Sequence, residues 1–226
     1  MSMTRTGEAA QATTAASFAD RRRLRAERAE AVLDAAVAIF STRGYHDASM
    51  DAIAARAGVS KPAVYSHYGS KDELYVACIE RASGKFHDAL EAGVLAAGGP
   101  QERMWSGIMI LLDHVERERG EWSMLFQGGA LPPGPVSVEV AGVRERTTAL
   151  IAGLFTDTAE CAGIAGSAID AMDPFGSAFV GTAEGLIRWW LDNADAPKGS
   201  VAMYFMNYVW SGLGGLIEGR LWMPED

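Results

Sequence analysis

The sequence lacks most of the features that mark β-proteins, disulfide-stabilised proteins and metalloenzymes. Its 226 residues include only two cysteines, Cys78 and Cys161, and four histidines, with no zinc-ligand spacing among them. There is no Asn-Gly hairpin turn and no clear run of alternating apolar and polar residues, which argues against strands. We therefore expect an all-α fold, a reduced cytoplasmic protein, and neither a metal nor a cofactor.

Apolar targeting segments are also scarce. Residues 1–20 are polar and rich in alanine and threonine, without the apolar stretch of a secretory signal, so we expect a disordered arm there. Residues 199–217 hold no charge over 19 positions, which is close to a membrane-spanning length. Asn207, several glycines and the absence of a basic cluster in the flanks favour a helix buried in a bundle or a subunit interface instead.

Catalytic constellations are missing from the sequence as well. It contains no phosphate-binding loop and no nucleophile elbow, and the His-Asp pairs at 46–47 and 87–88 lie within or shortly after residues 1–80. We expect that the protein is not an enzyme.

Charge is distributed unevenly along the chain. The formal net charge is −9, which excludes a generally basic nucleic-acid coat. Residues 1–80 carry 10 of the 20 basic and 10 of the 29 acidic side chains, so the whole acidic surplus follows residue 80. Two regions with different tasks are the simplest interpretation.

Apolar residues recur at helical spacing throughout the first region. The spacing predicts a helix over 21–44, in which Val32, Ala36, Ile39 and Phe40 share one face and Gly44 ends the helix. Further helices are predicted over 49–57, over 61–68 and from residue 71 to about residue 95.

The stretch from residue 49 to residue 71 has the pattern of a helix-turn-helix. Gly58 permits a left-handed turn, Ser60 can cap the next helix, and Pro62 is tolerated in a first turn because its missing amide would have no intrahelical partner. In that motif the second helix enters the major groove of DNA. An ordinary helical hairpin with a glycine turn is the alternative.

The residue types of this stretch suit contact with DNA. Lysines neutralise phosphates, hydroxyl groups donate hydrogen bonds to phosphate oxygens, small apolar groups fit a thymine methyl, and a histidine can reach phosphate or base. Val64 and Tyr68 are expected to face the core instead. The candidate DNA-binding residues are Ser49, Ser60, Lys61, Pro62, Ala63, Tyr65, His67 and Lys71.

The segment "MDAIAARAGVSKPAVYSHYGSKDEL", with "AVLDAAVAIFSTRGYHDAS" before it, resembles the DNA-binding domain of tetracycline-repressor-like (TetR family) transcriptional regulators. The resemblance is tight over residues 25–80 and loose beyond them. Two departures are small: many relatives carry phenylalanine where Tyr68 stands, and Met50 replaces a smaller or β-branched residue. The matching positions are Ala35, Ala36, Phe40, Gly44, Ile53, Ala54, Ala57, Gly58, Val59, Ser60, Tyr65, Tyr68, Lys71 and Leu74.

The resemblance implies an N-terminal three-helix DNA-binding domain, over 21–70, and a larger helical ligand-binding and dimerisation domain, over 71–226. It implies DNA contacts at the eight candidate residues named above. The arginines between residues 21 and 25 add either further DNA contacts or a solvated helix start.

Five helices are predicted in the second region, near 101–118, 121–128, 138–156, 173–194 and 200–222, with Asp173 as a cap. The last two are too apolar to be left in water, and the resemblance implies that they form a homodimer interface. Such a dimer predicts a palindromic or near-palindromic operator.

The resemblance also implies a pocket for a small-molecule effector, and the aromatic residues favour an apolar or aromatic ligand. Ordinary core packing is the alternative for each residue, Glu184 and Arg188 have the spacing of a simple ion pair, and Gln127 and Trp189 are further candidates. We expect a repressor that the ligand releases from DNA; a regulator without a ligand and an activator remain open. The candidate ligand-binding residues are Trp105, Met109, Leu112, His114, Trp122, Phe126, Phe155, Phe179, Glu184 and Arg188.

Overall fold

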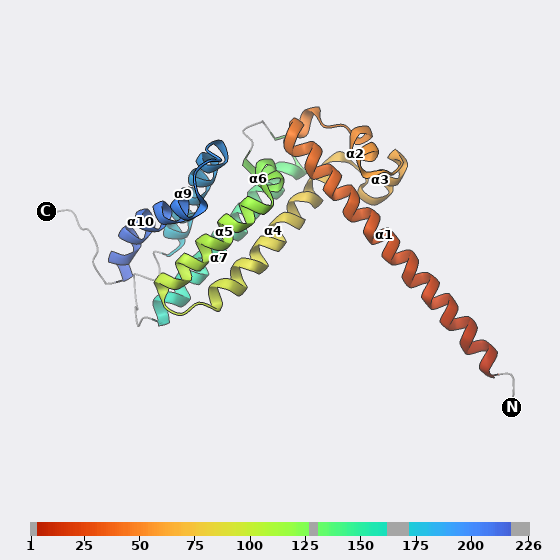
Figure 1. Ribbon diagram of the computed structural model, residues 1–226, viewed down its shortest axis with the longest axis horizontal. Helices are drawn as coiled ribbons and strands as arrows, with labels where there is room; N and C mark the ends of the chain where they lie inside the picture. The colour runs from red at the N-terminus through yellow and green to blue at the C-terminus, as the bar shows by residue number, and fades with distance from the viewer. Residues whose placement is uncertain (1–3, 127–130, 162–171, 218–226) are drawn as a thin grey trace. The chain divides into compact units, whose positions relative to one another are not determined.

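A computed structural model describes residues 4–126, 131–161 and 172–217 of the chain (Figure 1). Within these ranges the secondary structure is helical and contains no strand, as the sequence predicts. The chain divides into two compact units, residues 1–78 and 79–226. The helices are α1 (Thr4–Asp47), α2 (Met50–Ala57), α3 (Lys61–Tyr68), α4 (Lys71–Leu95), α5 (Pro100–Arg117), α6 (Arg119–Phe126), α7 (Pro135–Cys161), α9 (Met172–Asp192) and α10 (Lys198–Ile217).

The first helix is longer than the sequence predicts. We expected a disordered arm over residues 1–20 and a helix from residue 21, but α1 begins at Thr4. Residues 8–19 are rich in alanine, the residue with the highest helix propensity, and contain no proline. Gly44, the predicted helix end, interrupts the regular helix with φ 74° and ψ 174°, a backbone conformation that favours glycine.

The core of the first unit is built around the apolar face of α1. Val32, Ala36 and Phe40 are buried, as are Ile53 on α2 and Val64 on α3. Each lies at the spacing that places one helix face toward its neighbours, and burial of such faces supplies most of the stability of short helices.

The unit boundary lies eight residues later than the predicted domain boundary at 70/71. The first turns of α4 belong to the first core: the Tyr75 ring meets the Phe40 ring edge-to-face at 4.8 Å, and the Cys78 thiol points to the Leu33 carbonyl at 3.9 Å. Leu74 is fully buried in the same stretch. Side-chain packing therefore moves the boundary into α4, whereas the sequence shows only where the helix starts.

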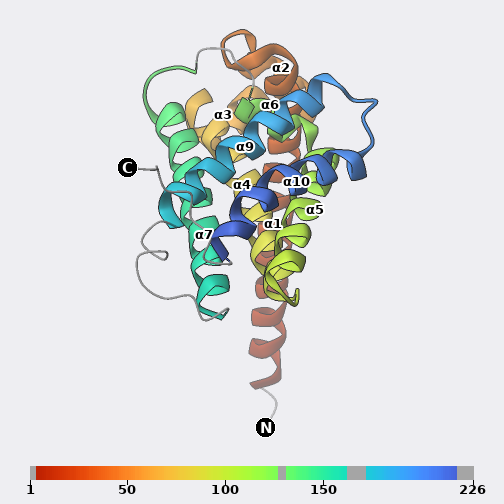
Figure 2. The same ribbon diagram turned by 90° about the vertical axis from the view of Figure 1, so that its left-hand side faces the viewer.

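The second unit is a helical bundle in which α9 packs on α7 and α10 packs on α5 (Figure 2). The α5 helix is strongly amphipathic and buries Met104, Ile108, Leu112 and Val115. The Trp190 side chain of α9 is 2% exposed, and its indole N–H donates to the Ala196 carbonyl at 2.9 Å. These contacts fix the connection between α9 and α10 against the bundle.

The helix bounds of this unit differ from the predicted ones by a few residues. The α9 helix begins at Met172, so Asp173 lies inside its first turn, and the side chain of Asp173 lies outside the described residues. The α10 helix begins at Lys198 and is described to Ile217, so the predicted end near residue 222 lies outside the described residues. None of the helices that the structure describes is long and apolar enough to cross a membrane.

Candidate nucleic-acid interface

The turn between α2 and α3 is built by three local signals. The Ser49 hydroxyl caps α2 by accepting from the Ala52 amide at 3.2 Å, and the Ser60 hydroxyl caps α3 by accepting from the Ala63 amide at 3.3 Å. Gly58 adopts the left-handed conformation, with φ 67° and ψ 27°. Pro62 lies in the first turn of α3, where no amide is needed. The predicted helix-turn-helix is present.

One side of α3 fixes the helix to the unit. Val64 is fully buried, and the partly buried Tyr68 donates its hydroxyl to the Ala29 carbonyl of α1 at 3.2 Å. Both residues were expected to support the core, and the structure agrees. Because the anchor lies on this side, α3 presents its opposite side to solvent.

The solvent-facing side of α3 carries most of the candidate DNA-binding residues. Lys61, Pro62 and Ser60 are exposed, and the Tyr65 side chain is 42% exposed. Ala63 is half-buried, and so is His67, whose ring lies 6.1 Å from that of Tyr68. The structure thus gathers six of the eight candidates, residues 60–63, 65 and 67, on or at the start of one short helix.

Lys61 does not stand alone on this surface. Its ammonium lies 2.8 Å from the Asp51 carboxylate in the first turn of α2, and both side chains are largely exposed. The hydrogen bond and charge of Asp51 raise the pKa of Lys61. Asp51 was not among the candidates, because it lies ten residues before Lys61 and on another helix, so no local signal in the sequence indicated this pairing.

Lys71 has a structural task at the start of α4. Its ammonium donates to the His46 carbonyl at 3.1 Å and lies 4.5 Å from the centre of the Tyr45 ring. Partial burial lowers the pKa of Lys71. The Tyr45 hydroxyl also donates to Asp72. These contacts tie the end of α1 to the start of α4, a role that the sequence did not indicate.

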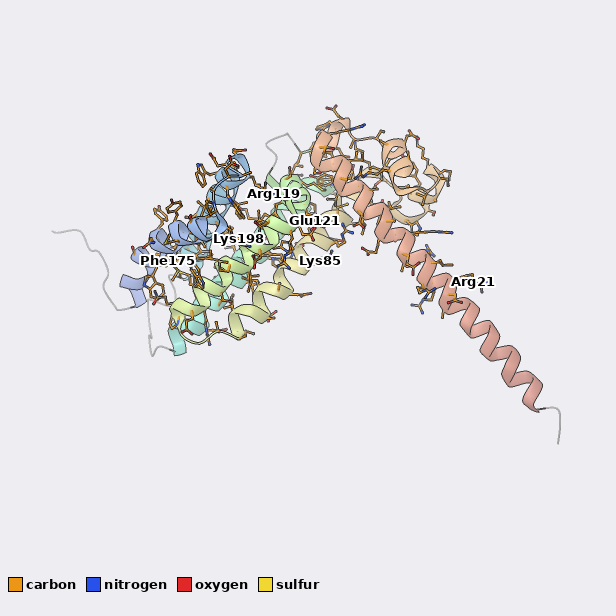
Figure 3. All side chains as sticks on the ribbon, in the orientation of Figure 1. Arg21, Lys85, Arg119, Glu121, Phe175 and Lys198 are labelled. Carbon is orange, nitrogen blue, oxygen red and sulfur yellow. The ribbon has the colours of Figure 1, made fainter. Side chains whose placement is uncertain are left out.

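A basic stretch of α1 precedes the motif. The arginines between residues 21 and 25 and Arg28 are all exposed (Arg21 is labelled in Figure 3), and Arg23 lies 3.6 Å from Glu27 one turn along the helix. Exposed i,i+4 pairs contribute little stability, so this segment does not depend on its charges to fold.

The candidate ligand-binding residues of the second unit do not form one group. Phe86, His114 and Trp122 meet with ring centroids 5.5 to 6.0 Å apart. Phe179 meets Phe155 at 5.3 Å and Phe205 at 5.0 Å. Because Phe86 and Phe205 were not candidates, the structure adds one residue to each aromatic cluster. Leu112 is buried in the core, and Met109 packs against that core.

The remaining ligand candidates lie elsewhere. Trp105 is 42% exposed, and Arg188 is exposed. The Glu184 carboxylate pairs with the Arg144 guanidinium of α7 at 2.8 Å, not with Arg188 one turn away. The side chain of Phe126 and the whole of Gln127 lie outside the described residues.

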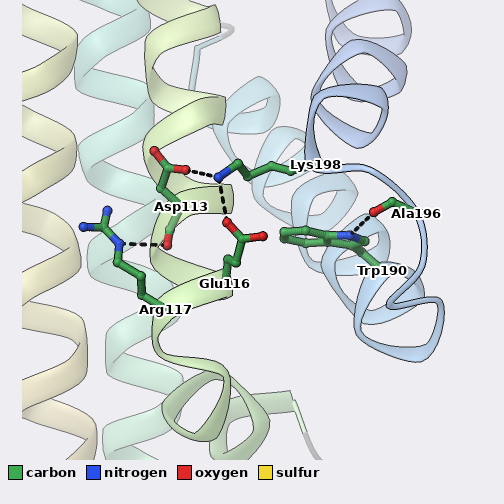
Figure 4. Close-up of polar contacts among 6 residues, drawn as sticks. All are labelled: Asp113, Glu116, Arg117, Trp190, Ala196 and Lys198. Carbon is green, nitrogen blue, oxygen red and sulfur yellow. Dashed lines mark hydrogen bonds and ion pairs between the residues drawn. The ribbon is translucent and has the colours of Figure 1, made fainter.

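A polar cluster, called the Lys198 clamp below, joins the start of α10 to α5. The Lys198 ammonium at the start of α10 lies 2.6 Å from both the Asp113 and the Glu116 carboxylates of α5 (Figure 4). On the adjoining α6, the Arg119 guanidinium lies 5.8 Å from the centre of the Trp190 ring of α9. Within the described part of the chain, no three His, Cys, Asp or Glu side chains come close enough to hold a metal ion.

The geometry of α2 and α3 defines a helix-turn-helix protein whose second unit is a separate helical bundle. Comparison with known proteins gives the family. Residues 32–78 match the model of "Bacterial regulatory proteins, tetR family", and residues 100–212 match that of "Tetracyclin repressor-like, C-terminal domain". The chain belongs to the TetR family of bacterial transcriptional regulators. It is a DNA-binding regulator and not an enzyme, and members of the family bind DNA operators as dimers.

Three relatives illustrate the similarity. A crystallised TetR-like regulator from Rhodococcus sp. RHA1 is 33% identical, with a TM-score of 0.67 over 83% of this chain and 96% of that chain. The transcriptional activator FasR of Mycolicibacterium smegmatis is 28% identical over 84% of each chain. The transcriptional repressor KstR of the same species is 35% identical over 34% of this chain and 38% of its own.

Proposed function

We propose that the protein is a homodimer that binds a palindromic or near-palindromic operator through α3 of each protomer and leaves it when an apolar or aromatic ligand binds the second unit. The observation that supports this most is the division of labour on α3. Val64 and Tyr68 hold the helix from one side, while Lys61, Pro62 and Tyr65 occupy the other. A helix that is anchored in this way presents a fixed surface to the major groove.

The proposed contacts divide into positioning and reading groups. Within the part of the chain that the structure describes, the Ser49 and Ser60 hydroxyls each cap a helix by accepting from an amide, which leaves their protons available to a phosphate. They and Lys61 suit phosphate oxygens, as do the free amides at both helix N-termini. Pro62 and Ala63 offer small apolar surface to a thymine methyl, so base selection rests mainly on shape and on Tyr65 and His67.

The proposed dimer interface is formed by α9 and α10. Large side chains stand exposed on both helices: Trp189 is 44% exposed, Met203 51%, Tyr204 58% and Tyr208 73%. Tyr204 and Tyr208 are one turn apart and therefore share a face of α10. Aromatic residues and methionine are the types enriched in interface cores. A dimer that spaces two α3 helices by about 34–36 Å would fit successive turns of the major groove.

The proposed ligand site lies among the aromatic clusters of the second unit. His114 is half-buried beside Phe86 and Trp122, and burial is the first cause that lowers its pKa. A neutral imidazole among aromatic rings suits an apolar ligand better than an anionic one. Ligand binding would shift the population toward a dimer whose α3 helices do not match the operator, with a coupling of about 1–3 kcal/mol.

Activation of transcription is the second candidate function. It is favoured by one observation, namely that the relative aligned over 84% of both chains is named as an activator. The DNA-binding surface would be the same in both cases, and the position of the operator relative to the promoter would decide the outcome.

The experiment that tests the DNA-binding proposal is selection of bound fragments from genomic DNA, followed by fluorescence anisotropy on the selected sequence. We expect the Lys61→Ala and Tyr65→Ala variants to bind the selected fragment more weakly, and a Lys85→Ala variant, which removes an exposed lysine of the second unit, to bind it normally. Equal binding by all four proteins would refute the assignment of α3.

The interface has its own test. Sedimentation of the Tyr208→Glu variant should give a monomer, because the added charge would be buried in the dimer. Val138 of α7 is 70% exposed, so Val138→Glu is a matched control that should remain dimeric. A dimeric Tyr208→Glu protein would place the interface elsewhere.

A further inference from the structure

The Glu121 side chain of α6 is buried, although a glutamate carboxylate is ordinarily charged at neutral pH. Its side chain is 3% exposed, and its Oε1 atom accepts from the Arg81 guanidinium of α4 at 3.2 Å. Arg81 is itself 12% exposed. The following residues Trp122 and Met124 are buried as well, so this short helix turns Glu121 toward the bundle together with its apolar face.

The second carboxylate oxygen of Glu121 is unsatisfied. Oε2 is buried and has no hydrogen-bond partner among the residues that the structure describes. A buried acceptor without a donor loses the hydration that it has in the unfolded chain and gains nothing in return. A buried ion pair is in general no more stabilising than apolar residues of the same size, so fold stability alone does not account for Glu121.

Trp122, the residue that follows Glu121 on α6, belongs to an aromatic cluster. Phe86 of α4, His114 of α5 and Trp122 of α6 form the ring cluster already described. Burial raises the pKa of Glu121, and Glu118 adds to this, whereas Arg81 and Lys85 oppose it. Lys85 and Glu121 lie on the facing helices α4 and α6 (Figure 3).

We propose that Glu121 Oε2 is the polar anchor of the effector site and accepts a hydrogen bond from a hydroxyl or protonated amine at one end of a ligand whose aromatic body packs against Phe86, His114 and Trp122. This inference rests on the proposed function, in which the second unit binds an effector. It adds the chemistry of the ligand head. A head that donates a hydrogen bond can pair with the buried Oε2 atom, whereas a carboxylate or phosphate head would be repelled by the negative charge of Glu121. Sites that hydrogen-bond a substrate group discriminate strongly against analogues that lack it.

The test compares three probes with one aromatic body: naphthalene-1-methanol, naphthalene-1-methylamine and naphthalene-1-carboxylate. Binding to the full chain is measured by isothermal titration calorimetry. We expect the alcohol and the amine to bind at least about ten-fold more tightly than the carboxylate. The E121Q variant should remove this preference, because the amide places a donor where Oε2 accepted. E91Q, which makes the same change at an exposed position of α4, should retain it.

A double variant, R81M/E121L, separates the anchor from a structural role. Apolar replacement of a buried pair commonly keeps or raises stability, so the melting temperature should not fall, while the preference for donor probes should vanish. The inference is overturned if the carboxylate binds as tightly as the other probes, if E121Q retains the preference, or if no probe binds at millimolar concentration. Operator binding by the wild-type chain is measured in parallel. If the wild-type chain does not bind the operator, that result counts against the proposed function and not against the anchor.

Discussion

Removing the Asp51 carboxylate should tighten binding to DNA. Asp51 holds the Lys61 ammonium at 2.8 Å, and Lys61 is the only lysine among the residues of α3. A phosphate that Lys61 contacts therefore competes with Asp51 for the ammonium. The replaced carboxylate then remains beside the DNA backbone at the start of α2, next to the Ser49 cap. In the Asp51→Asn variant the ammonium is free from the outset and no carboxylate is left against the phosphates.

The salt dependence of binding gives the size of this effect. Each phosphate neutralised by the protein contributes about 0.9 to the slope of log affinity against log salt. In the wild type, Asp51 takes up a cation when Lys61 leaves it, so that contribution is largely cancelled. The variant should recover up to about 0.9 per protomer, or about 1.8 per dimer. Between about 50 and 200 mM salt, the loss of affinity should be about ten-fold larger for the variant than for the wild type, starting from a tighter complex at low salt.

The assay is fluorescence anisotropy with the selected operator and with a scrambled duplex over that range of salt. Because Lys61 is proposed to meet a phosphate, both duplexes should gain equally and the preference for the operator should stay the same. Lys61→Met provides the control, since adding Asp51→Asn to that background should leave only the loss of direct repulsion. An unchanged salt slope in Asp51→Asn, or the same change of slope in both backgrounds, would refute the competition.

Three further predictions concern the two units separately. Tyr68→Phe removes the hydrogen bond to the Ala29 carbonyl and should lower the free energy of unfolding, measured in urea, by about 1 kcal/mol. A Tyr68→Phe protein that does not fold would contradict this prediction. The pKa of His114 is lowered from its ordinary value of 6.5, so stability is fully present above that pH and falls as the unfolded chain takes up protons below it; His114→Gln should flatten this dependence in urea titrations at several pH values. Replacing the four arginines between residues 21 and 25 by glutamine should lower the salt slope of DNA binding by about 0.9 for each phosphate that these arginines neutralise, and an unchanged slope would assign them to a solvated helix start.

Local signals made the first unit predictable from its sequence. The caps at Ser49 and Ser60 and the left-handed Gly58 depend on side chains within three residues of the backbone groups that they satisfy. The burial of Val64 follows from helical spacing within one short segment. Such features need no knowledge of distant parts of the chain, and the family resemblance rests on the same residues.

Partners across helices could not be predicted in this way. The sequence offered Arg188 as a partner for Glu184 because it is one turn away, but Arg144 of α7 takes that place from 40 residues away. Arg81 and Glu121 are also 40 residues apart, and neither stood out while the folded arrangement of α4 and α6 was unknown. The unit boundary at residue 78 has the same origin, since it depends on which core Tyr75 and Cys78 join.

The second unit offers a physical route from the proposed anchor to the proposed interface. Glu121 lies two residues after Arg119 on an eight-residue helix, so a shift of α6 that accommodates a ligand moves both side chains. Arg119 lies over the Trp190 ring of α9, and the loop that follows Trp190 is fixed by its bond to the Ala196 carbonyl and by the Lys198 clamp (Figure 4). Closely packed elements change between discrete arrangements more readily than they deform. A ligand that repositions α6 would therefore also shift the α9 and α10 surface that is proposed to set the spacing of the dimer.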